Sequence, residues 1–418
     1  QELPNYGVFD EKRYFTSGDE SFVFECQQTK VGVLICEDQW VDGPIDRLCQ
    51  SNVDVVVSLN ASPFQIDKQN QRIDICKHYA LKFDLLFIYV NMVGGQDEVV
   101  FDGNSFVISN LGELTLQLPA FKEISSLHIS SDYPPSILSE EESIYSALVL
   151  ATRDYIQKNS FGGALIGLSG GIDSALTLAV AADAIGPENV HAVMMPYQFT
   201  SEMSLEDSEL QARTQGVQFS NIDIHSMVDS FNFSLNDFFE NTSPDSTEEN
   251  IQARVRGTLL MALSNKYHKI VLATGNKSEM AVGYATLYGD MCGGFAPLKD
   301  IPKTMVYRLS SYRNTVTPVI PERVITRPPS AELAPNQIDQ DTLPSYDVLD
   351  DILKRFVELK HSVAQITEQG HSLEVVNKIT SMILRNEYKR RQSAPGPKIS
   401  GNAFGKERRY PMTSKFKP

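Results

Sequence analysis

The stretch GGALIGLSGGIDSALTLAVAADAIG, residues 162–186, decides the fold of the larger part of this chain. It opens with a short apolar run, continues through a glycine-rich turn and ends in an alanine- and leucine-rich run of helical character. In the turn, Gly170 and Gly171 stand between hydroxyl and carboxyl residues, so backbone N–H groups can converge on an anion without a Cβ in the way. The stretch therefore predicts a strand, a phosphate-binding turn and a helix.

The alternation of strand and helix continues beyond this stretch. Further strand candidates are HAVMMP (191–196), SNIDI (220–224) and KIVLATG (269–275), and the helical candidates between them are SLEDSELQARTQ (204–215) and NIQARVRGTLLMALSNKY (250–267). This pattern predicts an α/β fold with a doubly wound parallel sheet, whose ligand lies outside the carboxyl ends of the strands. Thr200 and Thr274 each follow a strand and are placed for that ligand.

The earlier part of the chain has a different pattern. Short β-type runs, separated by turns and one helical stretch, are VGVLI (31–35), VDVVVSL (53–59), LLFIYVN (85–91) and NSFVIS (104–109). The composition then changes to SSLHISSDYPPSILS, whose prolines and serines are typical of a linker. Ser139 and Glu142 form a capping box for the next helix. We predict a first domain over 1–124, a linker over 125–139 and a second domain over 140–418.

The composition of the 418 residues narrows the class of protein. Hydrophobic residues make up 42% and charged residues 22%, as in soluble globular proteins with more than one core. The chain shows no signal pattern and no apolar run long enough for a membrane span, so we expect a cytoplasmic location and no membrane partner. The net charge of −16 argues against a nucleic-acid partner. The five cysteines and seven histidines show no metal or disulfide spacing.

The charge is unevenly distributed along the chain. Residues 385–418 carry ten basic and two acidic side chains, which gives this tail a charge of +8 and leaves −24 for the rest. Such a tail is either a solvated basic segment or a segment that folds over an anionic ligand. The sequence leaves both interpretations open.

The turn itself matches the pattern SGGxDS at residues 169–174. It resembles the pyrophosphate loop of ATP pyrophosphatases, which cleave ATP between the α and β phosphates. The chemistry accounts for the residue types, because the Ser169 and Ser174 hydroxyls and the glycine amides can hold the leaving pyrophosphate. Asp173 can hold a magnesium ion that neutralises it.

Polar residues beyond the turn could complete this ligand site. Glu279 follows another strand and could share a magnesium ion with Asp173, although a lone glutamate at a helix start is usually a dipole partner. Asn250 and Arg254 lie four residues apart on a polar helix face. That face could contact an anionic ligand, although such a face is more often solvated.

Longer strings make the resemblance specific. TGNKSE (274–279), YATLYGDMCGGFAPLKDIPKT (284–304), RPPSAEL (327–333) and NEYKRRQ (386–392) resemble the synthetase domain of glutamine-dependent NAD synthetases. The resemblance implies ATP-dependent amidation of deamido-NAD to NAD through an adenylated intermediate, with release of AMP and pyrophosphate. It also implies that the enzyme uses ATP and Mg²⁺ and is a homo-oligomer, at least a dimer.

Carried over by position, the resemblance assigns residues to each ligand. The ATP-binding residues would be Gly167, Leu168, Ser169, Gly170, Gly171, Ile172, Asp173, Ser174 and Thr274. The deamido-NAD-binding residues would be Asn250, Arg254, Glu279, Tyr284, Thr286 and Lys389, and the metal ligands would be Asp173 and Glu279. Thr200 and Ser204 lie in a segment that resembles the adenine side of the family, although Ser204 could equally cap a helix. Leu287 departs from ammonia-dependent members, which often carry lysine there.

Cys36 follows the apolar run VGVLI. A free cysteine in such a place is normally a small core residue. However, ICEDQW (35–40), NASPF (60–64) and NMVGGQDEVVFDG (91–103) resemble the nitrilase-type glutaminase half of the same enzymes. The resemblance implies a partial nitrilase-like α/β sandwich, in which the Cys36 thiolate attacks the side-chain amide of L-glutamine, forms a thioester and releases ammonia.

The resemblance also assigns Tyr6, Ser62 and Lys68 to glutamine binding, although a lysine after a turn is ordinarily a surface residue. In the family, the cysteine works with a lysine just ahead of an LPNY-like segment and with a glutamate far upstream. LPNY stands here at residues 3–6. We therefore expect both partners to be absent and the glutaminase half to be N-terminally incomplete.

Two other functions compete with this interpretation. Another amidotransferase with the SGGxDS loop could make GMP or asparagine or modify a tRNA, but such enzymes lack TGNKSE and YATLYGD, and the acidic charge disfavours tRNA. Alternatively, the chain could be a non-catalytic nucleotide-binding module. The presence of Asp173 and Glu279 argues against a module without catalysis.

Overall fold

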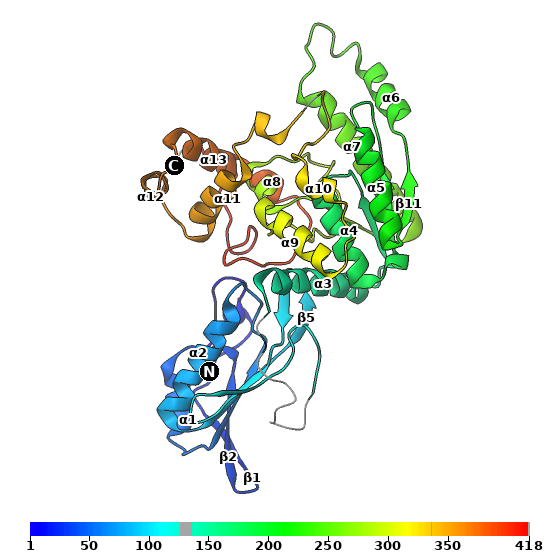
Figure 1. The fold of residues 1–418 in the computed structure, drawn as a ribbon. Coiled ribbons are helices and arrows are strands. Elements are labelled where there is room, and N and C mark those ends of the chain that lie inside the picture. Colours follow the sequence, from blue (N-terminus) through cyan, green and yellow to red (C-terminus); the bar gives the residue numbers. More distant parts are fainter. Residues whose placement is uncertain (126–135, 137, 336, 417–418) are drawn as a thin grey trace. The chain divides into compact units, whose positions relative to one another are not determined.

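The computed structural model describes residues 1–125, 136, 138–335 and 337–416 (Figure 1). The chain forms two compact units, Gln1–Ala147 (unit 1) and Leu148–Pro418 (unit 2). Most of the expected linker at 125–139 lies outside the described residues, so the three-part division of the chain stays a prediction.

Unit 1 is built on a six-stranded sheet with the order β1-β2-β3-β4-β7-β8. Its strands are β1 (Phe22–Cys26), β2 (Thr29–Ile35), β3 (Val55–Asn60), β4 (Leu86–Asn91), β7 (Phe106–Ile108) and β8 (Leu114–Gln117). β2, β3 and β4 run parallel, and the outer strands pair antiparallel. A separate hairpin joins β5 (Val93–Gln96) to β6 (Val99–Asp102). The four predicted apolar runs become β2, β3, β4 and β7.

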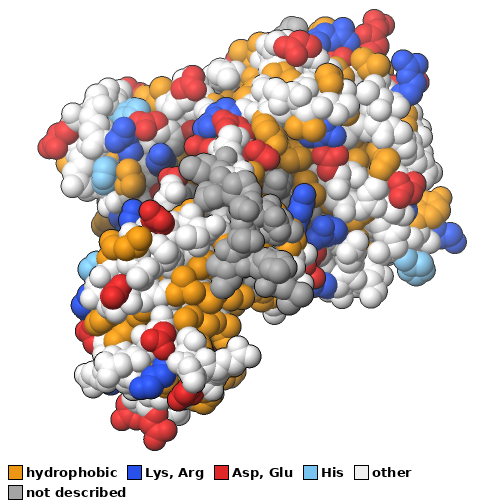
Figure 2. All heavy atoms as spheres, turned by 60° about the horizontal axis from the view of Figure 1, so that its bottom comes forward, with side chains coloured by type: hydrophobic (Ala, Val, Ile, Leu, Met, Phe, Trp, Pro, Cys, Tyr) orange, Lys and Arg blue, Asp and Glu red, His pale blue; other side chains and the backbone are white. Residues whose placement is uncertain are grey.

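Side chains of the central strands alternate between two faces of this sheet. Leu34, Val56 and Phe87 point into a core that α1 (Asp42–Cys49) and α2 (Lys68–Phe83) close. Their neighbours Ile35 and Leu59, on the opposite face, are 63% and 48% exposed. Hydrophobic side chains gather on the surface of unit 1 in Figure 2. Both helices of this core therefore cover the same face of the sheet.

Unit 2 contains a four-stranded parallel sheet with the order β11-β10-β9-β12. Its strands are β9 (Ala164–Gly167), β10 (Val190–Met194), β11 (Gln218–Asn221) and β12 (Ile270–Leu272). All four overlap predicted segments, although β10 begins one residue and β11 two residues before them. In sequence order, β9 is the first strand of this sheet. β10 and β11 follow on one side of it, and β12 is then placed on its other side. This confirms the doubly wound sheet and puts a topological switch point between β9 and β12.

The helices of this part of the chain pack on the sheet or, as α11, α12 and α13 do, in a separate group beside it (Figure 1). In chain order they are α3 (Glu140–Lys158), α4 (Ile172–Ile185), α5 (Glu202–Gln215), α6 (His225–Leu235), α7 (Ser246–Tyr267), α8 (Lys277–Val282), α9 (Lys303–Val316), α10 (Glu322–Thr326), α11 (Tyr346–Leu353), α12 (Val363–Glu368), α13 (Leu373–Arg385) and α14 (Glu387–Arg390). The predicted cap before α3 is present, since the Glu142 N–H donates to Ser139 Oγ at 3.1 Å. No helix among the described residues has the length and apolar character needed to cross a membrane.

The C-terminal segment packs on unit 2 instead of extending into solvent. Ala281 of α8 shares a core with Leu349 of α11 and Ile379 of α13. Basic side chains of the tail pair internally, as in Arg390 with Glu387 at 3.0 Å. The solvated interpretation is therefore wrong for this part of the tail, while its closure over an anionic ligand stays a prediction.

Candidate functional site

The glycine-rich turn follows β9 and opens α4. Gly170 has a φ of +80°, and a Cβ there would lie 2.8 Å from Cα of Ser204, so only glycine fits. Ser174 closes the turn, because its hydroxyl donates to the Gly171 carbonyl at 2.9 Å and accepts from the Ser169 N–H at 3.2 Å. The end of a buried strand and the N-terminus of a long helix thus meet where an anion is stabilised.

Asp173, in the first turn of α4, is held by the loop that follows β12. This loop begins at Thr274, which is half-buried. Asn276 donates from Nδ2 to Oδ1 of Asp173 at 2.8 Å, and it caps α8 by accepting the Glu279 N–H at 3.0 Å. Because β9 and β12 are neighbours, the loops at their carboxyl ends lie side by side. The structure thereby brings the predicted metal ligands Asp173 and Glu279 to the switch point.

Lys303, the first residue of α9, lies between these two carboxylates. Its Nζ contacts Asp173 and lies 3.3 Å from Oε1 of Glu279, and its side chain is 3% exposed. Burial alone would lower the pKa of Lys303, but the charges of Asp173 and Glu279 outweigh burial and raise it. Burial, together with the Asp173 charge, raises the pKa of Glu279 to about 8. Lys303 carries no local signal in the sequence that would predict this role, because its partners lie on other elements.

Two predicted deamido-NAD residues on α7 contact a turn over residues 283–290. Asn250 Oδ1 accepts from the Thr286 hydroxyl at 2.6 Å. Arg254, one helical turn later, donates from Nε to the Leu287 carbonyl at 3.2 Å. The polar face of α7 therefore contacts this turn, and the expected contact of Asn250 and Arg254 with an anionic ligand stays a prediction.

Lys389 and Tyr284 belong to the same group. Lys389 Nζ donates to the carbonyls of Gly283 and Ala285, at 2.7 Å each. Burial, with the nearby Asp339 carboxylate, raises the pKa of the Tyr284 hydroxyl. The residues predicted to bind deamido-NAD, which come from three separate parts of the chain, are thus gathered around one turn.

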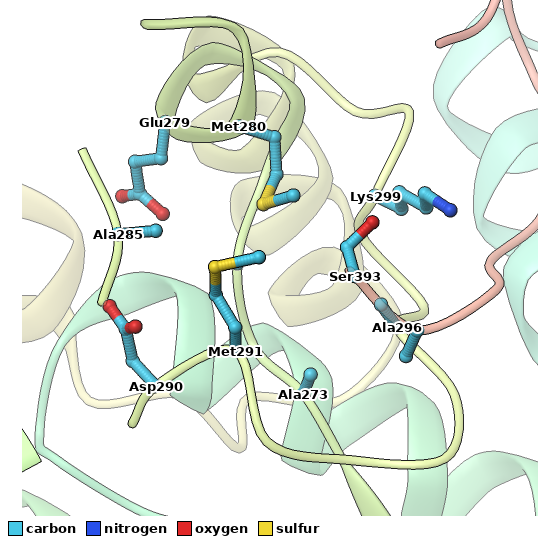
Figure 3. Close-up of a pocket in the computed structure, with 11 residues that line it drawn as sticks. Ala273, Glu279, Met280, Ala285, Asp290, Met291, Ala296, Lys299 and Ser393 are labelled. Carbon is cyan, nitrogen blue, oxygen red and sulfur yellow. The ribbon is translucent and has the colours of Figure 1, made fainter. Parts of the chain in front are cut away.

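A small pocket opens beside this turn (Figure 3). Glu279 and Asp290 lie on one side of it, and the side chains of Met280 and Met291 lie in its middle. Burial raises the pKa of Asp290 to about 6, although the Thr286 N–H donates to its carboxylate at 2.7 Å. The pocket therefore places two carboxyl groups of raised pKa beside the turn, an arrangement typical of functional sites.

The segment expected near the adenine lies at the start of α5. Thr200 accepts a backbone hydrogen bond through its hydroxyl in the turn after β10. Ser201 is the N-cap of α5, since its side chain accepts the Ser204 N–H at 3.2 Å. The Ser204 hydroxyl donates to Glu332 at 2.8 Å. The cap role considered for Ser204 is therefore wrong, and the ligand roles of Thr200 and Ser204 stay predictions.

Cys36 stands at the carboxyl end of β2, where a short 3-10 helix, Cys36–Gln39, begins. Its φ of +43° is rare for a residue with a side chain and marks a sharp change of direction. Burial raises the pKa of the Cys36 thiol, while a hydrogen bond from the Ala61 backbone and the Arg72 charge oppose that rise. A thiol with a backbone donor beside it suits nucleophilic attack on an amide.

Two of the predicted glutamine-binding residues contact the turn that begins at Cys36. The Tyr6 hydroxyl donates to Oε1 of Glu37 at 2.8 Å. Lys68 Nζ lies 3.9 Å from the centre of the Trp40 ring, a cation–π contact. The structure therefore brings Tyr6 and Lys68 to the segment of the proposed nucleophile.

Ser62, the third predicted glutamine residue, is held by residues that the sequence analysis does not single out. Arg72, fully buried on α2, donates to the Ser62 hydroxyl at 3.2 Å and to its carbonyl at 2.8 Å, and it pairs with Asp102 at 2.8 Å. Asn91 accepts the Ser62 N–H at 2.9 Å. This buried network fixes the loop that also carries Ala61. Asn91 and Asp102 lie in the quoted string 91–103, whereas Arg72 had no sequence signal.

The residues that could hold a metal ion are Asp173 and Glu279. In the described ranges, no group of three or more His, Cys, Asp or Glu side chains could hold a metal. Two carboxylates fit an ion that takes its other oxygen ligands from phosphate and water, as magnesium does with nucleotides. The donor set therefore fits magnesium bound together with a nucleotide.

Comparisons with known proteins follow the same division of the chain. Residues 144–393 match the family model for NAD synthase, and residues 2–133 match the model for carbon-nitrogen hydrolase. The chain is 53% identical to the glutamine-dependent NAD(+) synthetase of Acinetobacter baylyi over 426 residues, which cover 100% of this chain and 79% of that protein. The expectation of an incomplete glutaminase half is not borne out by these comparisons.

Solved structures give the same result. The glutamine-dependent NAD+ synthetase of Acinetobacter baumannii, in complex with ADP, has a TM-score of 0.76 and 52% identity, over 98% of this chain and 77% of that chain. The enzyme of Cytophaga hutchinsonii has a TM-score of 0.83 at 21% identity, over 99% and 79% of the two chains, which supports the fold. With both units matched and more than half of its residues shared with a relative, this chain belongs to the glutamine-dependent NAD synthetase family.

Proposed function

We propose that the chain converts deamido-NAD to NAD at the expense of ATP, with ammonia taken from glutamine. The observation that carries this proposal is the meeting of the glycine-rich turn with the Asn276–Glu279 capping box at the switch point of the sheet. In doubly wound folds, this is where nucleotides bind. The family of the chain and the names of its relatives support the same reaction.

In the first step, a carboxylate oxygen of deamido-NAD attacks the α-phosphorus of ATP, and pyrophosphate leaves. Ser169, Ser174 and the glycine amides of the turn would hold the pyrophosphate as its charge develops. Asp173 and Glu279 would hold magnesium, which supplies positive charge to the phosphates. In the second step, ammonia attacks the adenylated carbonyl carbon and loses a proton, and AMP leaves with the electron pair of the broken bond.

The turn over residues 283–290 is proposed to present deamido-NAD to this centre. Its support is the convergence of Asn250, Thr286 and Lys389 on one turn beside the pocket of Figure 3. Thr274 and the residues from Gly167 to Ser174 are proposed to contact ATP. These residue roles rest on position in the family pattern and on geometry.

Ammonia is proposed to come from the first unit. The Cys36 thiol would lose its proton and its sulfur would attack the carbonyl carbon of the glutamine side chain, while the amide nitrogen takes up that proton and leaves as ammonia. Water would then hydrolyse the thioester to glutamate and restore the thiol. This role is supported by the Ala61 N–H, which donates to the thiol. It is also supported by the contacts of Tyr6 and Lys68 with the turn that begins at Cys36, and by Ser62, which follows Ala61 in the same loop. By the family resemblance, we also propose a homo-oligomer of at least two copies, which light scattering of the purified protein would test.

The function is tested by incubating the protein with deamido-NAD, ATP and magnesium, with ammonium or glutamine in separate reactions, and measuring NAD and AMP. We expect NAD and AMP in equal amounts from either source. Asp173→Asn should abolish both reactions, whereas Cys36→Ala should abolish only the glutamine-supported one. Unchanged NAD output from Asp173→Asn would remove the metal assignment, and no NAD from either source would point to a different carboxylate substrate.

A further inference from the structure

A lysine ammonium already occupies the space between the two carboxylates proposed to hold magnesium. Lys303 Nζ contacts Asp173 and lies 3.3 Å from Glu279, with its side chain almost completely buried. Asn276 donates to the other oxygen of Asp173 at 2.8 Å. One ammonium thus faces both carboxyl groups, and a neutral amide donates to one of them.

The position of Lys303 is fixed by contacts on its own backbone and on its side chain. The Lys303 N–H donates to the Ser278 hydroxyl at 2.8 Å, and the next N–H, that of Thr304, donates to Asp350 at 2.8 Å. The ring of Tyr346 lies 5.3 Å from Nζ. The start of α9 is therefore anchored to α8 and α11, which delivers the ammonium to the carboxylate pair without a loop that must first become ordered.

We propose that Lys303 is an internal counter-cation that stands in the metal position of the nucleotide-free enzyme and makes metal binding depend on nucleotide. The proposal rests on the proposed function, in which Asp173 and Glu279 hold magnesium. A divalent cation and an ammonium repel each other when both contact the same two carboxylates in a partly buried site, which disfavours binding of both at once. The metal can enter only when the ammonium moves, and the phosphates of a nucleotide supply the negative charge that allows both cations to stay.

A consequence is that the metal and the nucleotide bind together and not one after the other. The carboxylates meanwhile remain paired, so the site keeps its shape without a bound ion. Removing the ammonium should convert the pair into a simple cation site that binds a divalent ion without nucleotide.

The experiment measures Mn²⁺ binding by electron paramagnetic resonance, with Mn²⁺ alone and with a non-hydrolysable ATP analogue. For the unmodified protein we expect no binding of Mn²⁺ alone at about 0.1 mM, a concentration that fills only sites of moderate or high affinity. With the analogue present, we expect one bound ion. Binding of Mn²⁺ alone as tight as binding with the analogue would overturn the proposal. This comparison needs no variant.

Variants separate the charge of Lys303 from its shape. Lys303→Met should bind Mn²⁺ without nucleotide at least tenfold more tightly than the unmodified protein, and its melting temperature should rise on addition of Mn²⁺ alone. Lys303→Arg keeps the cation, so neither its Mn²⁺ affinity nor its melting temperature with Mn²⁺ should change. The double variant Lys303→Met with Asp173→Asn should lose the Mn²⁺ binding that Lys303→Met gains. No gain in Lys303→Met, verified as folded by circular dichroism, would overturn the proposal. The proposed function is judged separately, by NAD formation in the unmodified protein.

Discussion

Asn276 donates from Nδ2 to a carboxylate oxygen of Asp173 at 2.8 Å, across 103 positions of the sequence. The opposite end of the same amide accepts the Glu279 N–H at 3.0 Å and caps α8. One side chain thus orients the aspartate of the glycine-rich turn and begins the helix that carries Glu279. The two halves of the proposed nucleotide site are joined through it.

Replacing Asn276 by alanine should weaken binding of ATP with magnesium about tenfold, because the partly buried Asp173 carboxylate loses a donor whose absence costs about 1–3 kcal/mol. The lost cap should also lower the free energy of unfolding by about 1 kcal/mol. Calorimetric titration with an ATP analogue and urea unfolding measure the two effects.

Ser362→Ala is the matched control for this variant. Ser362 caps α12 with the same box, accepting the Gln365 N–H, away from the nucleotide site. It should lose a similar free energy of unfolding and keep its nucleotide affinity. If both variants change affinity and stability alike, Asn276 acts only as a cap.

Gly170→Ala should remove nucleotide binding, since a Cβ at a φ of +80° would lie 2.8 Å from backbone atoms of Ser204. The displaced turn would no longer present its backbone at the start of α4. Gly216→Ala is the control, because Gly216 has a similar φ of +72° with nothing within 4 Å of its Cβ position. Gly216→Ala should lose about 1 kcal/mol of stability and keep its affinity for the ATP analogue. Equal affinities for the two variants would contradict the close-packing argument.

Glutamine binding should change the fluorescence of Trp40, the single tryptophan of the chain. Lys68 Nζ lies 3.9 Å from the ring centre, and the α-carboxylate of glutamine would draw it away. The measurement uses a Cys36→Ala background, in which glutamine is not consumed. Adding Lys68→Met should abolish the response and weaken glutamine binding about tenfold, whereas Lys82→Met, which removes a half-exposed lysine at the other end of α2, should leave both unchanged. A full response without Lys68 would exclude it from the glutamine site.

Asp290 should make the protein less stable as the pH rises. Burial raises its pKa from 3.8 to about 6 in the folded state. A carboxyl group with a raised folded pKa favours folding below its unfolded pKa, and this contribution is lost as the pH rises through about 6. As the pH is raised from 4 to 7.5, the free energy of unfolding of Asp290→Asn should therefore increase relative to that of the unmodified protein.

Urea unfolding followed by circular dichroism at both pH values measures this difference. Asp237→Asn, at an exposed position before α7, controls for the general effect of removing a carboxylate. If the two asparagine variants show the same pH dependence, burial of Asp290 contributes nothing to it.

Much of the fold could be predicted because its signals are local. The strands of unit 2 are short apolar runs separated by amphipathic segments, and the parallel arrangement follows from their alternation. The secondary-structure signals in the sequence were weaker where the strands are short and lie at the edge of a sheet. β1 and β8 lie at the edges of the first sheet and lack a continuous apolar run, so they were not anticipated.

The candidate site divides in a similar way. Cys36, the residues of the SGGxDS turn and Glu279 stand in strings whose residue types already suit their chemistry. Lys303 and Arg72 could not be found in this way, because each acts through partners on other elements, 130 and 30 positions away. Their role depends on burial beside a carboxylate, which a linear pattern does not record.

The sequence by itself determined the order of strands and helices, the position of the phosphate-binding turn and the residue types available for chemistry. Only the tertiary structure decided that the loops after β9 and β12 are neighbours, and that Lys303 lies between Asp173 and Glu279. The physical reason is that local propensity acts over a few residues. The pairing of strands and the burial of charges, in contrast, depend on contacts between segments that only the completed fold brings together.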